Sequence, residues 1–94
     1  MFDNQKYITK GVSQQISIYL QIIMWNLINE LEIEKDYLQV FELTAENGMQ
    51  KITHSQEMPP YEKSHLIKCE EPVSAKIFVI DDETHSTMLL AEEY

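Results

Sequence analysis

The chain has 94 residues, of which 44% are hydrophobic, so it can bury one modest core and is expected to form a single domain over residues 1–94. Acidic residues outnumber basic ones by 16 to 7, which gives a formal net charge of −9. All seven basic residues are lysines, and arginine, the side chain that reads guanine edges and clamps phosphates, is absent. This balance argues against direct nucleic-acid binding and favours a protein surface or a cation as the partner.

Cysteine usage and the first residues indicate a cytoplasmic protein. Cys69 stands alone, which excludes an internal disulfide and with it a disulfide-stapled secreted domain. Residues 1–6 lack the charged segment and apolar run of a signal peptide. The apolar stretch 16–33 approaches membrane length, but asparagine, glutamine and glutamate side chains interrupt it, so no membrane association is expected.

The N-terminal third predicts a short strand followed by one long helix. Residues 5–10 are prone to β structure and end at Gly11. Helical periodicity then extends over residues 16–33, with Ser13 or, preferably, Ser17 as the N-terminal cap. Three glutamates gather at the expected C-terminal end, which is the unfavourable end of the helix dipole for negative charge.

This helix carries apolar side chains on two opposite faces. A helix that covers a sheet needs only one apolar stripe. The broad stripe consists of Leu20, Ile23, Met24, Leu27, Ile28 and Leu31. Ile18, Ile22 and Trp25 lie roughly opposite, and Asn29 extends their row. The second stripe therefore has to be covered by another part of the chain, by a second copy, or by a different partner.

A hairpin follows the helix. Residues 37–44 and 49–54 alternate with a period of two, and Asn47-Gly48 between them is the dipeptide that best tolerates a type I′ turn. Pro59-Pro60 ends the hairpin because proline cannot donate to a β ladder. A two-residue loop would place these pairs side by side: Glu46 with Met49, Leu43 with Ile52, and Phe41 with His54.

Three further segments complete the predicted sheet. They are residues 63–70, 75–80 and 87–91, and residues 81–86 form the loop before the last of them. The apolar run 77–80 predicts a central strand that is buried on both faces. The order of elements predicts an α+β fold, with one amphipathic helix packed on a predominantly antiparallel sheet of four to six strands.

Several segments together resemble a family of short bacterial proteins known as the domain-of-unknown-function 960 family. These segments are YITKGV at residues 7–12, WNLI at 25–28, LQVFEL at 38–43, QKITHSQE at 50–57 and KIFVIDD at 76–82. The resemblance covers essentially the whole chain and implies a small cytoplasmic α+β domain. It implies no activity and no catalytic residues.

The acidic loop at residues 81–85 is the strongest metal candidate, because Asp81, Asp82 and His85 offer hard carboxylates and an imidazole within five positions. An EF-hand would need a glycine that the loop lacks, and a zinc or manganese site would need a third ligand such as His54 or His65. A solvated turn explains the same composition, because aspartate favours turn geometry. We favour the turn and predict no metal and no cofactor.

No group of residues in the sequence forms a convincing catalytic site. His54 and Ser55 are adjacent on a strand and should point to opposite faces, which separates a base from its nucleophile. His54 is instead expected to pair with Phe41 in a half-buried contact. Cys69 is followed by two glutamates, so an activated thiolate is not expected there. Two glycines in the whole chain leave no phosphate-cradling loop, and we predict a protein that is not an enzyme.

The second apolar stripe carries the main functional hypothesis. Either it is covered inside the chain by Phe2, Tyr7 or residues 88–90, or it is an interface in which a tryptophan with aliphatic neighbours acts as the anchor. The interface hypothesis predicts a non-enzymatic interaction or regulatory domain that binds an unidentified protein, or forms a homodimer, through Ile18, Ile22 and Trp25. The alternatives are a nucleic-acid mimic that inhibits a basic DNA- or RNA-handling protein, and a metal-dependent enzyme or sensor that uses the acidic loop.

Overall fold

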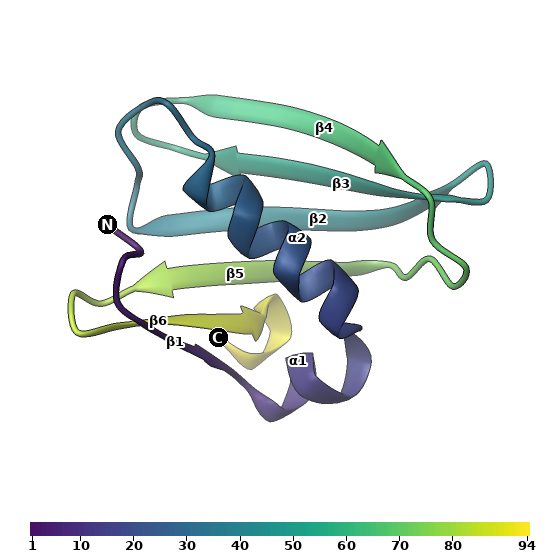
Figure 1. Ribbon diagram of the computed structural model, residues 1–94, viewed down its shortest axis with the longest axis horizontal. Coiled ribbons are helices and arrows are strands. Elements are labelled where there is room, and N and C mark those ends of the chain that lie inside the picture. The colour runs from purple at the N-terminus through teal and green to yellow at the C-terminus, as the bar shows by residue number, and fades with distance from the viewer.

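The computed structural model describes all residues, 1–94, and consists of one six-stranded sheet, two α-helices and a terminal 3-10 turn (Figure 1). In chain order the elements are β1 (Gln5–Ile8), α1 (Lys10–Gln15), α2 (Ile18–Asn29), β2 (Leu38–Glu46), β3 (Met49–Gln56), β4 (Tyr61–Ile67), β5 (Ala75–Asp81), β6 (His85–Leu90) and η1 (Ala91–Glu93).

The strands lie in the order β1-β6-β5-β2-β3-β4. Four of the five strand pairs are antiparallel, and only β1 runs parallel to its neighbour, β6. This pair joins the two ends of the chain, with Gln5 opposite His85 and Ile8 opposite Met88. The predicted α+β fold with a predominantly antiparallel sheet is confirmed.

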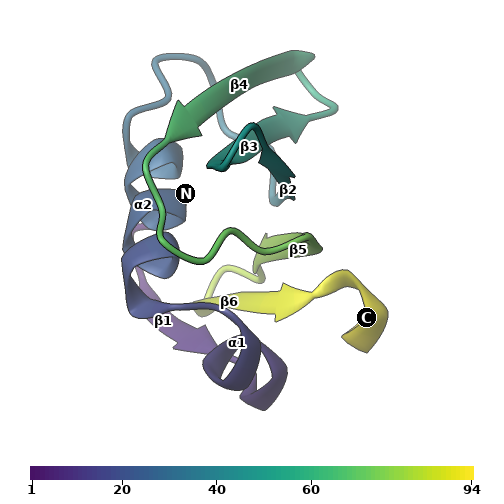
Figure 2. The ribbon, with the colours of Figure 1, turned by 90° about the vertical axis from the view of Figure 1, so that its right-hand side faces the viewer.

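Helix α2 crosses one face of the sheet, and the core lies between them (Figure 2). Leu20, Met24 and Ile28 point from α2 into this core and are fully buried, as one stripe of the helix predicted. Alternate residues of the central strands meet them, among them Phe41 and Ile77. The opposite sheet face is covered by no α-helix, and Tyr94 packs edge-on against Phe78 there, with ring centroids 5.7 Å apart.

The β2–β3 hairpin has the predicted register. Asn47 and Gly48 both adopt positive φ angles, 51° and 76°, as a type I′ turn requires. The expected pairs of Glu46 with Met49, Leu43 with Ile52 and Phe41 with His54 are all present.

The helix is shorter than predicted. It begins after Ser17, whose side chain accepts a hydrogen bond from the Leu20 amide as expected, and it ends at Asn29 rather than at residue 33. Ile16 and Ser17 both have extended backbone angles, which separates α2 from α1. The Ser17 cap is confirmed, whereas the predicted end at residue 33 was wrong because apolar spacing continued beyond the helical backbone.

The first strand was also predicted too long. It ends at Ile8, and Thr9 caps the separate helix α1 by accepting a hydrogen bond from the Val12 amide. Gly11 lies inside α1 instead of ending a strand. A Cβ atom there would come within 2.6 Å of the Glu93 carboxylate, so a larger residue would displace this side chain, which accepts a hydrogen bond from the Gly11 amide.

The last three strands differ from their predicted limits by up to three residues. β4 begins and ends earlier than residues 63–70, β5 extends to Asp81, and β6 begins at His85, two residues before predicted. Strand β5 is central, but burial on both faces holds only in part. Ile77 and Val79 are fully buried beneath α2, whereas Phe78 and Ile80 on the other face are half-buried.

Candidate protein interface

The side of α2 that points away from the sheet is apolar and open to solvent. Ile18 is 71% exposed, and Ile22, one turn later, is 53% exposed. Neither Phe2 nor residues 88–90 cover them, because Phe2, Met88 and Leu90 are buried on the other side of the helix in the core. Ile18, Tyr19, Ile22, Asn26 and Asn29 are the exposed residues of this side, which we call the outer face of α2.

Trp25 lies at the margin of the outer face and is half-buried. The ammonium group of Lys6 in β1 is 5.6 Å from the centroid of the indole ring and also donates to the Phe2 carbonyl oxygen. Lys6 therefore connects the N-terminal strand with the edge of the helix. The three residues of the predicted interface thus divide into two exposed isoleucines and one partly covered tryptophan.

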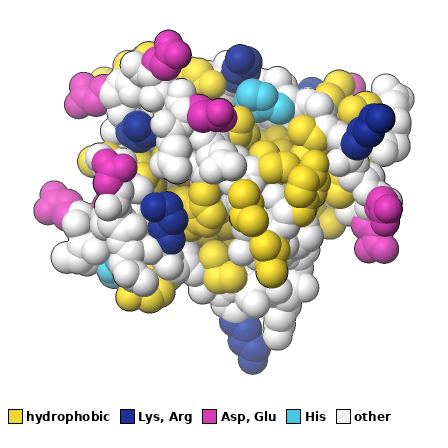
Figure 3. All heavy atoms as spheres, viewed as in Figure 1, with side chains coloured by type: hydrophobic (Ala, Val, Ile, Leu, Met, Phe, Trp, Pro, Cys, Tyr) yellow, Lys and Arg dark blue, Asp and Glu magenta, His cyan; other side chains and the backbone are white.

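No residue of α2 is charged, although 24% of the chain is. Hydrophobic side chains gather along α2 in Figure 3, and the acidic side chains in that view lie toward its edges. The centre of a protein interface is depleted in charged residues and rich in apolar and aromatic ones, and α2 has this composition. A solvated surface helix would instead alternate charges on its outer side.

A shallow hollow of about 470 Å³ adjoins the N-terminal end of the outer face. Ile18 forms one wall, and Cys69 and Val73 approach from the segment between β4 and β5. Cys69 is a half-buried free thiol. The hollow continues the surface beyond the first turn of α2, but its lining is mixed and includes the carboxylates of Glu70 and Glu71.

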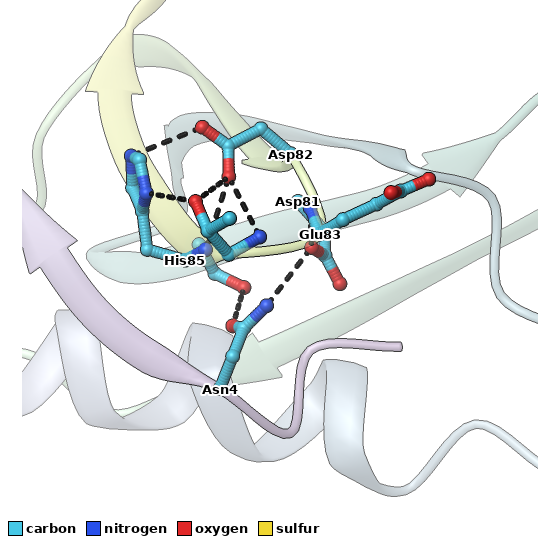
Figure 4. A network of polar contacts seen from close by, with 7 residues as sticks. Asn4, Asp81, Asp82, Glu83 and His85 are labelled. Atoms are coloured by element: carbon cyan, nitrogen blue, oxygen red, sulfur yellow. Dashed lines mark hydrogen bonds and ion pairs between the residues drawn. The ribbon is translucent and has the colours of Figure 1, made fainter.

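The acidic loop is a tight turn between β5 and β6, and its carboxylates bind the chain itself (Figure 4). Asp81 accepts hydrogen bonds from the Phe2 amide at 2.6 Å, the Asn4 side chain at 3.0 Å and the Glu83 amide at 2.7 Å. Burial alone would raise the pKa of this carboxyl, but these donors and the positive N-terminus together lower it. Asp81 thereby anchors the N-terminal segment to the sheet.

Asp82 organises the turn itself. One of its oxygens accepts from the backbone amides of His85 and Thr84 and from the Thr84 hydroxyl, and the other lies 3.1 Å from Nε2 of His85. The hydrogen bond from the His85 amide is the main reason that the pKa of Asp82 is lowered. This is the Asx-type geometry of an ordinary aspartate turn.

The three metal candidates do not form a metal centre with the remaining histidines. No group of three or more histidine, cysteine, aspartate or glutamate side chains is placed to hold an ion. His54 and His65 lie on β3 and β4, with β2 between these strands and β5, so neither reaches the turn.

His54 is fully buried rather than half-buried, and it stacks on Phe41 as the predicted pairing implied. Ser55 lies on the opposite sheet face, lining a separate hollow, so the two side chains diverge. Burial, and secondarily the nearby His65, lowers the pKa of His54 from 6.5 to about 4. The ring is therefore neutral at physiological pH and is a structural group of the core.

Sequence reasoning missed the polar network around this histidine. His54 Nε2 is 2.6 Å from the Gln39 Oε1 atom, and the Gln39 amide nitrogen donates to the Asp36 carbonyl and to Gln56 Oε1. Because the Gln39 nitrogen is the donor of that amide, its oxygen accepts, which assigns the proton of His54 to Nε2. Gln56 in turn donates to the carbonyl oxygens of Glu34 and Pro59. The only sequence signal was a glutamine at positions that the strand alternation assigns to the core.

Neither α-helix has both the length and the apolar character that crossing a lipid bilayer demands.

The fold and this surface define a small α+β domain with one outward-facing apolar helix. The chain belongs to the DUF960 family, described as a staphylococcal protein of unknown function, whose model matches residues 5–93. It is similar to a solved crystal structure of a protein of unknown function from Enterococcus faecalis, with 26% sequence identity and a TM-score of 0.87. That match covers 98% of this chain and 92% of the other. No curated protein matches the chain.

Proposed function

We propose that this protein is a non-enzymatic interaction or regulatory domain that docks on another polypeptide through the outer face of α2 and the neighbouring Trp25. The observation that carries the proposal is the exposure of Ile18 and Ile22 on a helix without charged residues. Exposing these two isoleucines to water is unfavourable. Burying one isoleucine side chain contributes on the order of 2 kcal/mol of favourable free energy.

The remaining chemistry-bearing groups support a non-enzymatic role because they are engaged within the fold. Asp81 and Asp82 accept hydrogen bonds in the β5–β6 turn, and His54 is neutral and stacked in the core. A nucleophile next to a base, with a third group orienting that base, is the arrangement that acyl-transfer enzymes need. His54 and Ser55 point to opposite sheet faces and do not supply it.

The net charge of −9 also suggested a nucleic-acid mimic. Such a mimic presents carboxylates on its docking surface, and its complex weakens steeply as salt concentration rises. The outer face of α2 holds no carboxylate, so the proposed complex is expected to tolerate salt.

The test compares the size of the complexes that the tagged protein forms in extracts of cells expressing it. Ile22→Glu puts a charge into the outer face, whereas Met58→Glu changes a side chain that is 72% exposed in the β3–β4 loop and serves as the matched control. Wild type and Met58→Glu should elute in the same complex at about 50 mM and about 500 mM salt. Ile22→Glu should elute as the monomer. Equal elution of all three proteins would contradict the proposal, and dissociation of the wild type at high salt would favour the mimic.

A further inference from the structure

We infer that the partner at the outer face of α2 is a second copy of this chain, with the two α2 helices packed antiparallel about a two-fold axis. The inference rests on the proposed function, because it identifies the occupant of the same surface. Three properties of α2 lead to it: the charge of its outer face, the acidic residues that follow its end, and the spacing of an outer row. This row consists of Ile18, Ile22, the half-buried Trp25 at the margin and Asn29.

The charge of the outer face favours self-association over a basic partner. A chain of net charge −9 repels its own copies wherever its carboxylates meet. The outer face is a region where two copies can meet without opposing carboxylates, because α2 has no charged residue. A surface evolved for a cationic partner would carry acidic side chains at its centre, where α2 has none.

The spacing of the outer row is that of paired helices. Ile18, Ile22, Trp25 and Asn29 are separated by four, three and four residues, which is the a/d spacing of a two-helix seam. In an antiparallel pair this row meets itself, so that Ile22 faces Trp25 of the second copy and Ile18 faces Asn29. Two-fold symmetry repeats both contacts, as an isologous interface requires.

The ends of α2 select the antiparallel orientation. The first turn contains no acidic residue and the last turn no basic one, so the residues of α2 itself compensate neither end of the helix dipole. Glu30 is the C-terminal cap, where its charge is unfavourable, and Glu32 follows in the next loop. Antiparallel packing brings these carboxylates to the N-terminus of the opposite α2. Parallel packing would bring the glutamates of both copies together.

The contact between the two helices is short, which limits the expected affinity of the dimer. Twelve residues span about 18 Å, and a helix of that length buries less than the roughly 800 Å² per partner of a standard stable interface. The dimer is therefore expected to dissociate in the micromolar range. Its measurement needs concentrations from about 1 µM to about 1 mM.

Sedimentation velocity over that range should show a monomer–dimer equilibrium for the wild type and for Met58→Glu. Ile22→Glu should raise the dissociation constant about tenfold or more. Glu30→Lys should weaken the dimer while raising the melting temperature of the monomer, because lysine suits its own helix end but not the opposite one. A wild type that is monomeric throughout overturns the inference. The proposed function then survives only if Ile22→Glu still abolishes the complex in extracts.

Cross-linking tests the orientation. In a Cys69→Ser background, which removes the thiol beside Ile18, the variants Ile18→Cys and Asn29→Cys are mixed and treated with a short bis-maleimide. The antiparallel pair yields a product that joins the two variants, because Ile18 of one copy faces Asn29 of the other. Positions 18 of both copies are separated by most of the helix length, so Ile18→Cys alone should give little product. Efficient self-cross-linking of Ile18→Cys, or no mixed product, overturns the inference.

Discussion

The imidazole ring of His54 lies flat against the phenyl ring of Phe41, with centroids 4.4 Å apart and an angle of 14° between the planes. Tyr61 packs edge-on against the same imidazole at 5.4 Å. Nε2 is bonded to Gln39, and Nδ1 has no hydrogen-bond partner within the chain. A proton added to Nδ1 would therefore place a charge and an unpaired donor in the core.

This environment predicts that the protein loses stability in mild acid. The pKa of His54 is about 4 in the folded chain and near 6.5 when unfolded, so the unfolded state binds more protons between these values. The contribution is fully present above pH 6.5 and is lost as the pH falls toward 4. We expect the free energy of unfolding in urea to fall by about 2 kcal/mol between pH 7 and pH 5. His54→Phe should flatten this dependence, and an unchanged slope in that variant would refute the assignment.

Gln39 and His54 should be energetically coupled. Gln39→Leu leaves the imidazole proton of His54 and the Asp36 carbonyl without their partner, which is expected to cost about 2 to 4 kcal/mol of stability for the buried groups together. The double variant Gln39→Leu/His54→Phe should lose less than the sum of the two single variants. Denaturant unfolding of all four proteins measures the coupling. Strict additivity would mean that the two side chains do not act as a unit.

The features that the sequence predicts well are local ones. The register of β2 and β3 follows from the positive φ angles that Asn47-Gly48 accepts, and the buried stripe of α2 follows from helical periodicity. The end of α2 was missed because the spacing of Leu31 continues the stripe although the backbone has already left the helix. Periodicity describes which side chains are apolar and does not report where the backbone hydrogen bonds end.

The contacts between distant segments were not predictable in this way. The parallel pairing of β1 with β6, and the bond from the Phe2 amide to Asp81, join residues at opposite ends of the chain. Gln39 and Gln56 occupy strand positions that the alternation assigns to the core. Their partners include carbonyl oxygens of loop residues, and the sequence does not define the path of these loops. The spacing of Ile18, Ile22 and Trp25 was enough to identify them as one side of the helix. The contact of Lys6 with the Trp25 ring depends on tertiary structure and could not be predicted.

Asp81 should hold the N-terminal segment in place. Asp81→Ala removes the acceptor for the Phe2 amide and the Asn4 side chain, and we expect a loss of about 1 to 3 kcal/mol in unfolding free energy. Amide hydrogen exchange of residues 2–8 should accelerate. Asp82→Ala disturbs the same turn without touching Phe2 and is the matched control. Equal acceleration in both variants would show that the turn, rather than the carboxylate of Asp81, retains the segment.

Divalent cations should not stabilise the protein. The carboxylates of Asp81 and Asp82 already accept hydrogen bonds from the chain, and His85 is paired with Asp82. A ligand that binds only the folded state raises the melting temperature, and the rise grows with the ratio of ligand concentration to dissociation constant. Thermal unfolding with calcium, manganese or zinc at about 1 mM should therefore match unfolding in a chelator. A rise in melting temperature that Asp82→Ala abolishes would establish a metal site in the turn.

The central claim is that the outer face of α2 is covered by protein in the cell. The most direct test places a photoreactive amino acid at position 22 or, as the control, at position 58, and irradiates living cells that produce the tagged chain. Both side chains are more than half exposed in the monomer, at 53% and 72%, so exposure alone does not favour either position. We predict a discrete cross-linked band from position 22, at twice the monomer mass if the partner is a second copy, and none from position 58. Absence of any band specific to position 22 would contradict the account.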